Sequence, residues 1–214
     1  MSIDYIAVLD HDHLDNGLFL KTFANALAKH QHRGLIIHSD SQYTDRIIQT
    51  GVMRDDARKR AIKDLNNRLI ALLADEGVSA IGLNGYQREL ISMTNGNISV
   101  DVEQLKKLPE QPVLLLSSLI YSHDSQQPVS APLADVTASL QEALNVEHTF
   151  LFARSDDSEL IKKELPESLE DVPDEKEFLQ NNVPEEFQEN TVSAKLISAN
   201  DFRNYPNLKN FTQL

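Results

Sequence analysis

The sequence predicts an α/β fold, a three-layer α/β/α sandwich in which a mostly parallel central sheet lies between two layers of helices. Two observations support this prediction. Short apolar runs, typical of strands buried on both faces, alternate along residues 1–154 with longer segments whose apolar residues recur at helical spacing. Glycine stands at several of the boundaries between these segments. Strands that alternate with helices in this way build βαβ units.

The first unit begins with the apolar run Tyr5–Leu9, which we expect to form a strand. Asp15 or Asn16 is suited to cap the helix that follows. Apolar residues at three- and four-residue steps give that helix one buried face, formed by Leu20, Phe23, Ala24 and Leu27. A second buried strand is expected from Leu35, and a polar helix over residues 41–49.

The alternation continues to residue 154. Asn95-Gly96, placed between two short apolar runs, is the strongest hairpin signal in the chain. Pro132 is suited to the first turn of a late helix. The other predicted elements are a long helix over 54–75, a strand at 78–81, a short helix at 101–108 and strands at 112–116 and 148–153.

The composition changes after Arg154. Residues 155–190 are rich in Asp and Glu, are interrupted by three prolines and contain few residues able to build a core. We expect a solvated, partly mobile acidic segment there, with a short helical excursion packed on the domain as the alternative. Residues 191–214 regain apolar side chains, and we expect this tail to dock on the α/β domain of residues 1–154.

Charge and composition exclude several classes of function. The chain has 33 acidic and 20 basic residues and a net charge of −13, so phosphate backbones repel it and we expect no nucleic-acid partner. The same argument excludes an anionic membrane surface. Without cysteine there is no disulfide, thiolate metal site or cysteine nucleophile. With neither a signal-like start nor an apolar stretch of ~20 residues, we expect a cytoplasmic protein.

Two stretches carry a resemblance to a known family. Residues 66–85 read "NNRLIALLADEGVSAIGLNG", and residues 111–154 run from "QPVLLLSS" through "APLADVTASL" to "HTFLFAR". The order of helices, strands and glycine turns resembles the amino-acid kinase family, and most closely the acetylglutamate kinases. The resemblance covers residues 4–154 and continues near Lys195. It implies ATP and Mg²⁺ as cofactors, a small-molecule carboxylate as partner, a place in arginine biosynthesis and a homodimer.

The resemblance also assigns roles to individual residues. The implied catalytic residues are Asp135 and Lys195, and the implied substrate-binding residues are Arg54, Asn66, Gly85 and His38. Arg suits a carboxylate because its planar fork binds two oxygens at once. Other interpretations stay open. Asp135 also fits the first turn of a helix, where the helix dipole favours a carboxylate by ~0.3–1 kcal/mol. Arg54 also fits a local ion pair with the acidic residues that follow it.

Several family positions are substituted in this chain. Val8 stands where the first strand of these enzymes carries a phosphate-binding Lys, and Asp10 and His11 stand where it carries glycines. Asp40 stands in the second glycine-rich loop. A carboxylate beside ATP phosphates repels them, and a Cβ atom blocks close approach of the backbone. Positive charge that would stabilise phosphoryl transfer is thus replaced by negative charge.

"DHDH", residues 10–13, allows one further hypothesis. His11 and His13 would share a face of a strand and, with His38, could hold a metal such as Zn²⁺. We prefer an ordinary polar end of the strand and predict no metal site.

Two functions of different class follow. The chain is an acetylglutamate kinase-like enzyme that transfers a phosphoryl group from ATP to the carboxylate of a small N-acyl amino acid, or it is a non-catalytic relative that senses a small molecule or binds a protein.

Overall fold

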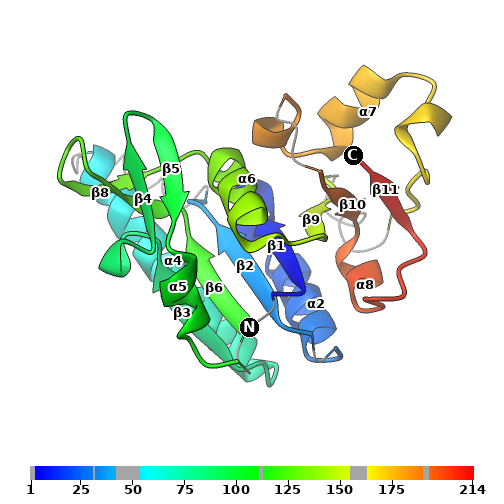
Figure 1. Ribbon diagram of the computed structural model, residues 1–214. Coiled ribbons are helices and arrows are strands. Elements are labelled where there is room, and N and C mark those ends of the chain that lie inside the picture. Colours follow the sequence, from blue (N-terminus) through cyan, green and yellow to red (C-terminus); the bar gives the residue numbers. More distant parts are fainter. Residues whose placement is uncertain (1–2, 31, 42–53, 111–112, 155–162, 190–192) are drawn as a thin grey trace.

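The computed structural model describes residues 3–30, 32–41, 54–110, 113–154, 163–189 and 193–214 (Figure 1). Its central sheet has seven strands in the order β11-β10-β9-β1-β2-β6-β3, and every neighbouring pair is parallel except β10 and β11. The predicted α/β fold with a mostly parallel sheet is therefore confirmed. The strands are β1 Tyr5–Leu9, β2 Gly34–His38, β3 Ala80–Asn84, β6 Val113–Ser117, β9 Thr149–Phe152, β10 Lys195–Ile197 and β11 Phe211–Gln213.

Helices cover both faces of this sheet because successive strand residues point to opposite sides. Tyr5 and Ala7 of β1 pack in one apolar cluster with α2, α4 and α8, whereas Ile6 and Val8 pack in a second cluster with α6. Both clusters are continuous from strand to helix, which produces the three layers seen in Figure 1. The helices are α1 His11–Leu14, α2 Gly17–Leu27, α4 Arg54–Asp75, α6 Leu133–Leu144 and α8 Ala199–Phe202.

A second, four-stranded sheet lies beside the first. Asn95 and Gly96 have φ values of 50° and 80°, the left-handed conformations that a tight hairpin turn requires, so the predicted hairpin is confirmed. A second hairpin, formed by β7 and β8, joins it through the parallel pair β4 and β7. The strand order is β5-β4-β7-β8. The bounds are β4 Ile91–Thr94, β5 Asn97–Val100, β7 Leu119–Ser122 and β8 Gln127–Ser130, with η1 Gln87–Glu89 and α5 Val102–Lys106 nearby.

Two predicted boundaries differ from the structure. The strand expected at 78–81 begins at Ala80, because residues before it close the end of α4: Val78 N–H donates to the Leu73 carbonyl at 2.8 Å, and Gly77 has a φ of 80°. "DHDH" forms the start of a helix and not the end of a strand, because the Asp10 side chain caps α1. The helix predicted over 41–49 lies outside the described residues.

The acidic part of the chain contains short helices where it is described. These are η2 Leu169–Asp171, α7 Glu175–Asn182 and η3 Glu185–Phe187. Leu165, Val183 and Phe187 are buried in the same apolar cluster as α6, so residues 163–189 pack on the α/β domain. The tail supplies β10, α8 and β11. Over the described ranges, the helices are all too short or too polar to cross a membrane.

Candidate functional site

A pocket of about 270 Å³ lies at the carboxyl edge of the large sheet, where β1, β2 and β9 end and α6 begins. Ligands of open α/β sheets generally bind at this edge. Residues from six separate parts of the chain line it, one of them Arg58 of α4. The lining residues are Asp10, His11, Asp12, Ser39, Asp40, Arg58, Leu133, Arg154, Pro184, Glu185, Glu186 and Phe187.

The Asp10 carboxylate, which lines the pocket, is paired with His13. Its Oδ1 atom accepts from the His13 backbone N–H at 3.2 Å and makes a short contact with Nδ1 of the same residue. Burial alone would raise the pKa of Asp10, but the charge and hydrogen bonds of His13, with Arg154 adding attraction, hold that pKa below its ordinary value. The His13 side chain is fully buried, and its Nε2 atom lies 3.3 Å from the Ala153 carbonyl oxygen. The pair therefore joins the end of β1 to the end of β9.

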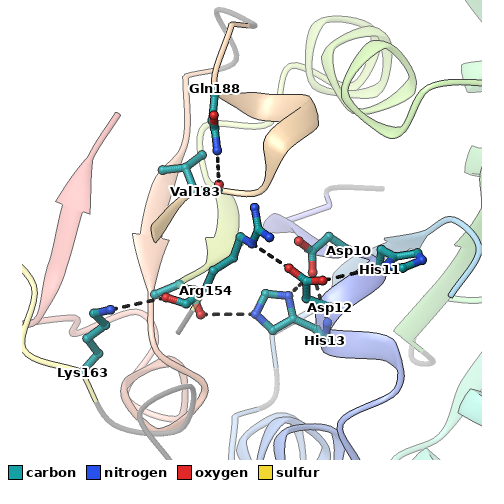
Figure 2. A network of polar contacts seen from close by, with 9 residues as sticks. Asp10, His11, Asp12, His13, Arg154, Lys163, Val183 and Gln188 are labelled. Atoms are coloured by element: carbon teal, nitrogen blue, oxygen red, sulfur yellow. Dashed lines mark hydrogen bonds and ion pairs between the residues drawn. The ribbon is translucent and has the colours of Figure 1, made fainter. Parts of the chain in front are cut away.

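Arg154 is paired with Asp12. Figure 2 shows the guanidinium reaching from the end of β9 to the carboxylate on α1, with 2.6 Å between Arg154 Nε and Asp12 Oδ2. The Arg154 backbone is held from both sides: its N–H donates to the Asn182 carbonyl at 2.8 Å, and Lys163 Nζ donates to its carbonyl at 3.3 Å. Arg154 thus connects the sheet to residues 163–189, the described part of the acidic segment, called the acidic excursion below.

Arg58 is paired with Asp40 on the other side of the pocket. Arg58 Nε donates to Asp40 Oδ2 at 2.7 Å. The Arg58 side chain is 51% exposed and that of Asp40 only 15%, so the carboxylate is the more fixed partner. This ion pair connects the segment after β2 to the first turns of α4, at the position that the resemblance matches to a glycine-rich loop.

Glu186 supplies the cap of α6. Pro132, at the cap position, has no side-chain hydrogen bond to the helix, although the first N–H groups of a helix need acceptors from outside it. Glu186 Oε2 accepts from the Leu133 N–H at 2.7 Å. A carboxylate here also interacts favourably with the positive end of the helix dipole.

The two guanidinium groups that line the pocket and the first N–H of α6 are therefore each matched by an internal carboxylate. Arg58 has Asp40, Arg154 has Asp12, and the α6 N-terminus has Glu186. Counting ionised side chains with His11 neutral, the lining residues carry five negative and two positive charges. The pocket is thus acidic, with its positive groups already neutralised.

The predicted substrate residue His38 is a buried residue at the end of β2. Its Nδ1 atom lies 2.9 Å from the Ser39 carbonyl oxygen, and its Nε2 atom has no hydrogen-bond partner among the described residues. Burial lowers the pKa of His38 to about 4, against the smaller opposing effect of the Ser39 carbonyl. The ring is therefore neutral at pH 7, and it does not line the pocket.

Asn66 and Gly85 hold the scaffold together. Asn66 is buried, and its Nδ2 atom donates to the Leu83 carbonyl at 2.7 Å, which fixes α4 to β3. A Cβ atom at Gly82 would lie 2.2 Å from Ile70 Cδ1, so glycine permits this close packing. At Gly85 a Cβ atom would lie 2.8 Å from the Leu119 carbonyl oxygen, where the two sheets meet.

Asp135 and Lys195 lie at different ends of the large sheet. Asp135 is exposed in the first turn of α6 and does not line the pocket. Lys195 begins β10, and its Nζ atom lies 3.3 Å from His148 Nδ1 and 5.1 Å from the centre of the Phe211 ring. The structure does not bring these two residues together. Arg54 begins α4, but its side chain lies outside the described part of the structure.

Sequence reasoning missed Arg58, Arg154 and Glu186. Arg154 could have been found, because it follows the last predicted strand and the ends of parallel strands share one edge. Arg58 lies one helical turn after Arg54 on the same predicted helix. No local pattern distinguishes Glu186 from the other acidic residues of its segment.

The residues present do not fit a bound MgATP. Asp10 and His11 occupy the turn after β1 where glycines would let backbone N–H groups approach phosphates, and Asp40 stands in the second loop. The hypothesis of a metal held by His11, His13 and His38 is not supported either. Within the described ranges, no group of three or more His, Asp or Glu side chains is placed to hold an ion. Both ring nitrogens of His13 already have partners: Nδ1 contacts Asp10, and Nε2 lies 3.3 Å from the Ala153 carbonyl oxygen.

No sequence-family model and no curated protein matches the chain. Solved structures match its fold. An isopentenyl phosphate kinase is 14% identical with a TM-score of 0.64, over 98% of this chain and 99% of that one. Aspartate kinase from Synechocystis is 12% identical with a TM-score of 0.64, but the match spans only 39% of that enzyme. N-acetylglutamate synthase from Neisseria gonorrhoeae, solved with coenzyme A and N-acetyl-glutamate, is 18% identical over 77% of this chain and 45% of that one, with a TM-score of 0.56.

The structural matches show the fold of the chain. At such low sequence identities they do not show its activity. The matched proteins are enzymes of the amino-acid kinase type, so the resemblance read from the sequence is confirmed at the level of architecture. The closer likeness to acetylglutamate kinases stays a prediction. This chain has the amino-acid kinase fold.

Proposed function

We propose that this protein is a non-catalytic relative of the amino-acid kinases, which uses the pocket at the carboxyl edge to recognise a small molecule that carries a positively charged group. One observation carries the proposal. Carboxylates of the protein itself are paired with the positive groups of the pocket, and the remaining carboxylates give it an excess of negative charge. A cleft lined by charges of one sign concentrates ligands of the opposite sign.

The same arrangement opposes phosphoryl transfer. That reaction depends on preorganised positive groups around the transferred phosphoryl. Here a nucleotide would have to displace Asp40 from Arg58 and Asp12 from Arg154, and it would still face the other carboxylates. The role as a small-molecule sensor therefore agrees better with the pocket than the transferase role does.

Phosphoryl transfer from MgATP to a carboxylate is the second candidate, because two guanidinium groups line the pocket. Arg58 and Arg154 would then replace the Lys that is absent from β1, and Arg54 would bind the acceptor carboxylate. In this case the cofactors are ATP and Mg²⁺ and the partner is a small N-acyl amino acid. A homodimer and a role in arginine biosynthesis belong with this candidate.

A coupled assay for ADP release separates the two candidates. Purified protein would be incubated with MgATP and N-acetyl-L-glutamate, with Arg58→Ala and Arg154→Ala as comparison variants. The sensor proposal predicts no ADP release above that of either variant. Release that requires the acceptor and is lost in both variants would establish the enzyme instead.

The preferred ligand class has its own test. Thermal unfolding would be followed with putrescine, L-lysine and glutarate at equal ionic strength. The sensor proposal predicts that an ammonium compound raises the melting temperature and that glutarate does not, since only binding to the folded state stabilises it. A rise with glutarate alone would contradict the proposed charge preference.

A further inference from the structure

We infer that Glu186 is the residue that determines the pocket's specificity against anions, because its carboxylate occupies the place where an anionic ligand would bind. This inference rests on the proposed function. The Glu186–Leu133 contact lies inside the pocket, and both residues line it. The carboxylate is therefore part of the binding surface.

Three groups that could bind an anion lie at the pocket where Glu186 is found. The backbone N–H of Leu133 begins a helix of 12 residues, and helix N-termini bind phosphate, sulfate and carboxylate groups. Arg58 and Arg154 line the same pocket from two other elements. Three donors from separate parts of the fold thus line one pocket, and a carboxylate of the protein itself is bound to the Leu133 N–H.

Glu186 differs from the other pocket carboxylates in how it is held. Asp10 caps α1 and Asp12 lies in α1, directly after β1, and Asp40 lies two residues after the end of β2, so all three stand at the sheet edge itself. Glu186 comes from η3 in the excursion, 53 residues after Leu133. Its removal leaves the sheet edge intact, which makes it the carboxylate whose loss can open the pocket to an anion.

Glu185 provides a matched control. It is adjacent in sequence, carries the same charge and lines the same pocket. Replacing either glutamate changes the net charge of the pocket equally, so a general electrostatic effect would be the same for both. Only a specific occupation of the anion position by Glu186 distinguishes them.

The test is titration of inorganic phosphate into wild type, Glu186→Ala, Glu186→Gln and Glu185→Ala, followed by calorimetry at low salt and neutral pH. We expect Glu186→Ala to bind phosphate at least about tenfold more tightly than Glu185→Ala, a difference of about 1.4 kcal/mol. Glu186→Gln keeps an oxygen for the Leu133 N–H but loses the charge, and we expect a smaller gain, about threefold.

Equal phosphate affinity in folded Glu186→Ala and Glu185→Ala would overturn the inference. If Glu186→Ala does not fold, Glu186→Gln decides in the same way, and equality with Glu185→Ala again overturns it. These outcomes are separate from the fate of the proposed function, which fails if the wild-type protein itself turns over MgATP.

Discussion

Glu186 Oε2 accepts a hydrogen bond from the Leu133 N–H at 2.7 Å, although the two residues are 53 positions apart. This contact links the acidic excursion to the first turn of α6, at the edge of the sheet where ligands of this fold class bind. The same pocket contains the ion pairs Arg58–Asp40 and Arg154–Asp12. Together they describe a pocket whose positive groups are satisfied from within the chain.

Loss of the helix cap has a measurable cost. Because Pro132 provides no side-chain acceptor, Glu186→Ala leaves the start of α6 without its hydrogen bond, and we expect a loss of about 1 kcal/mol of unfolding free energy. Urea denaturation measures it. Glu185→Ala serves as the control and is expected to change stability by less than about 0.5 kcal/mol. Equal effects of the two substitutions would show that Glu186 does not cap the helix.

Breaking the buried pair of Asp10 and His13 is expected to cost more. Asp10→Asn removes the charge that His13 faces, and loss of one partner of a buried pair typically costs about 3–5 kcal/mol. A double-mutant cycle with His13→Asn should give a coupling free energy of at least about 1 kcal/mol. The half-exposed His11, changed to Asn, should show no coupling to Asp10. Additive effects of Asp10→Asn and His13→Asn would contradict the pair.

His38 predicts a pH dependence of stability. Burial lowers its pKa to about 4 from an ordinary 6.5, so between these values the unfolded chain binds a proton that the folded chain does not. The free energy of unfolding is therefore unaffected by His38 above pH 6.5. As the pH falls toward 4, protonation of the unfolded chain lowers it by about 3 kcal/mol in total. Because the pKa of Asp10 is depressed below 3.8, its own contribution is lost only at lower pH.

The substitution His38→Leu should therefore flatten the stability curve measured by urea denaturation between pH 7 and pH 4.5. Some slope should remain, since burial and the neighbouring His32 also lower the pKa of His30 to about 4. The variant His123→Leu, at a half-exposed position, tests whether loss of any histidine flattens the curve. A slope in the His38 variant as steep as that of wild type would refute the assignment.

Gly82 tests the packing of α4 on β3. An added Cβ atom would lie 2.2 Å from Ile70 Cδ1 and 2.8 Å from Asn66 Oδ1, so we expect Gly82→Ala to destabilise the protein by about 1–3 kcal/mol. Gly17 begins α2 with nothing within 4 Å of its added Cβ atom. Gly17→Ala should therefore be neutral or stabilising by up to about 1 kcal/mol. The reverse order of the two variants in thermal unfolding would contradict this packing.

Local patterns predicted the large sheet because each of its central strands is a continuous apolar run. Asp10 and Asp40, which only the resemblance singled out, both line the pocket at the carboxyl edge of that sheet. The second sheet was not predicted as a unit, because its β4–β7 pairing joins two hairpins far apart in the sequence. Glu186 was missed for the same reason, as its partner lies in another element.

Some roles assigned by resemblance have structural explanations instead. Asn66 holds α4 to β3, and Gly85 permits a close approach between the sheets. A short motif cannot distinguish these packing roles from ligand contacts, because both require the same residue type at the same position. Asp135 and Lys195 remain predictions as catalytic residues, at opposite ends of the sheet.

The central claim is that carboxylates of the protein itself are paired with the positive and donor groups that a nucleotide would need for binding. The most direct test is a calorimetric titration of the purified protein with MgATP. We predict no saturable heat at protein concentrations able to detect a dissociation constant of ~0.1 mM, equivalent to roughly −5.5 kcal/mol. Saturable binding at one site, weakened by Arg58→Ala and by Arg154→Ala, would contradict the claim and support phosphoryl transfer.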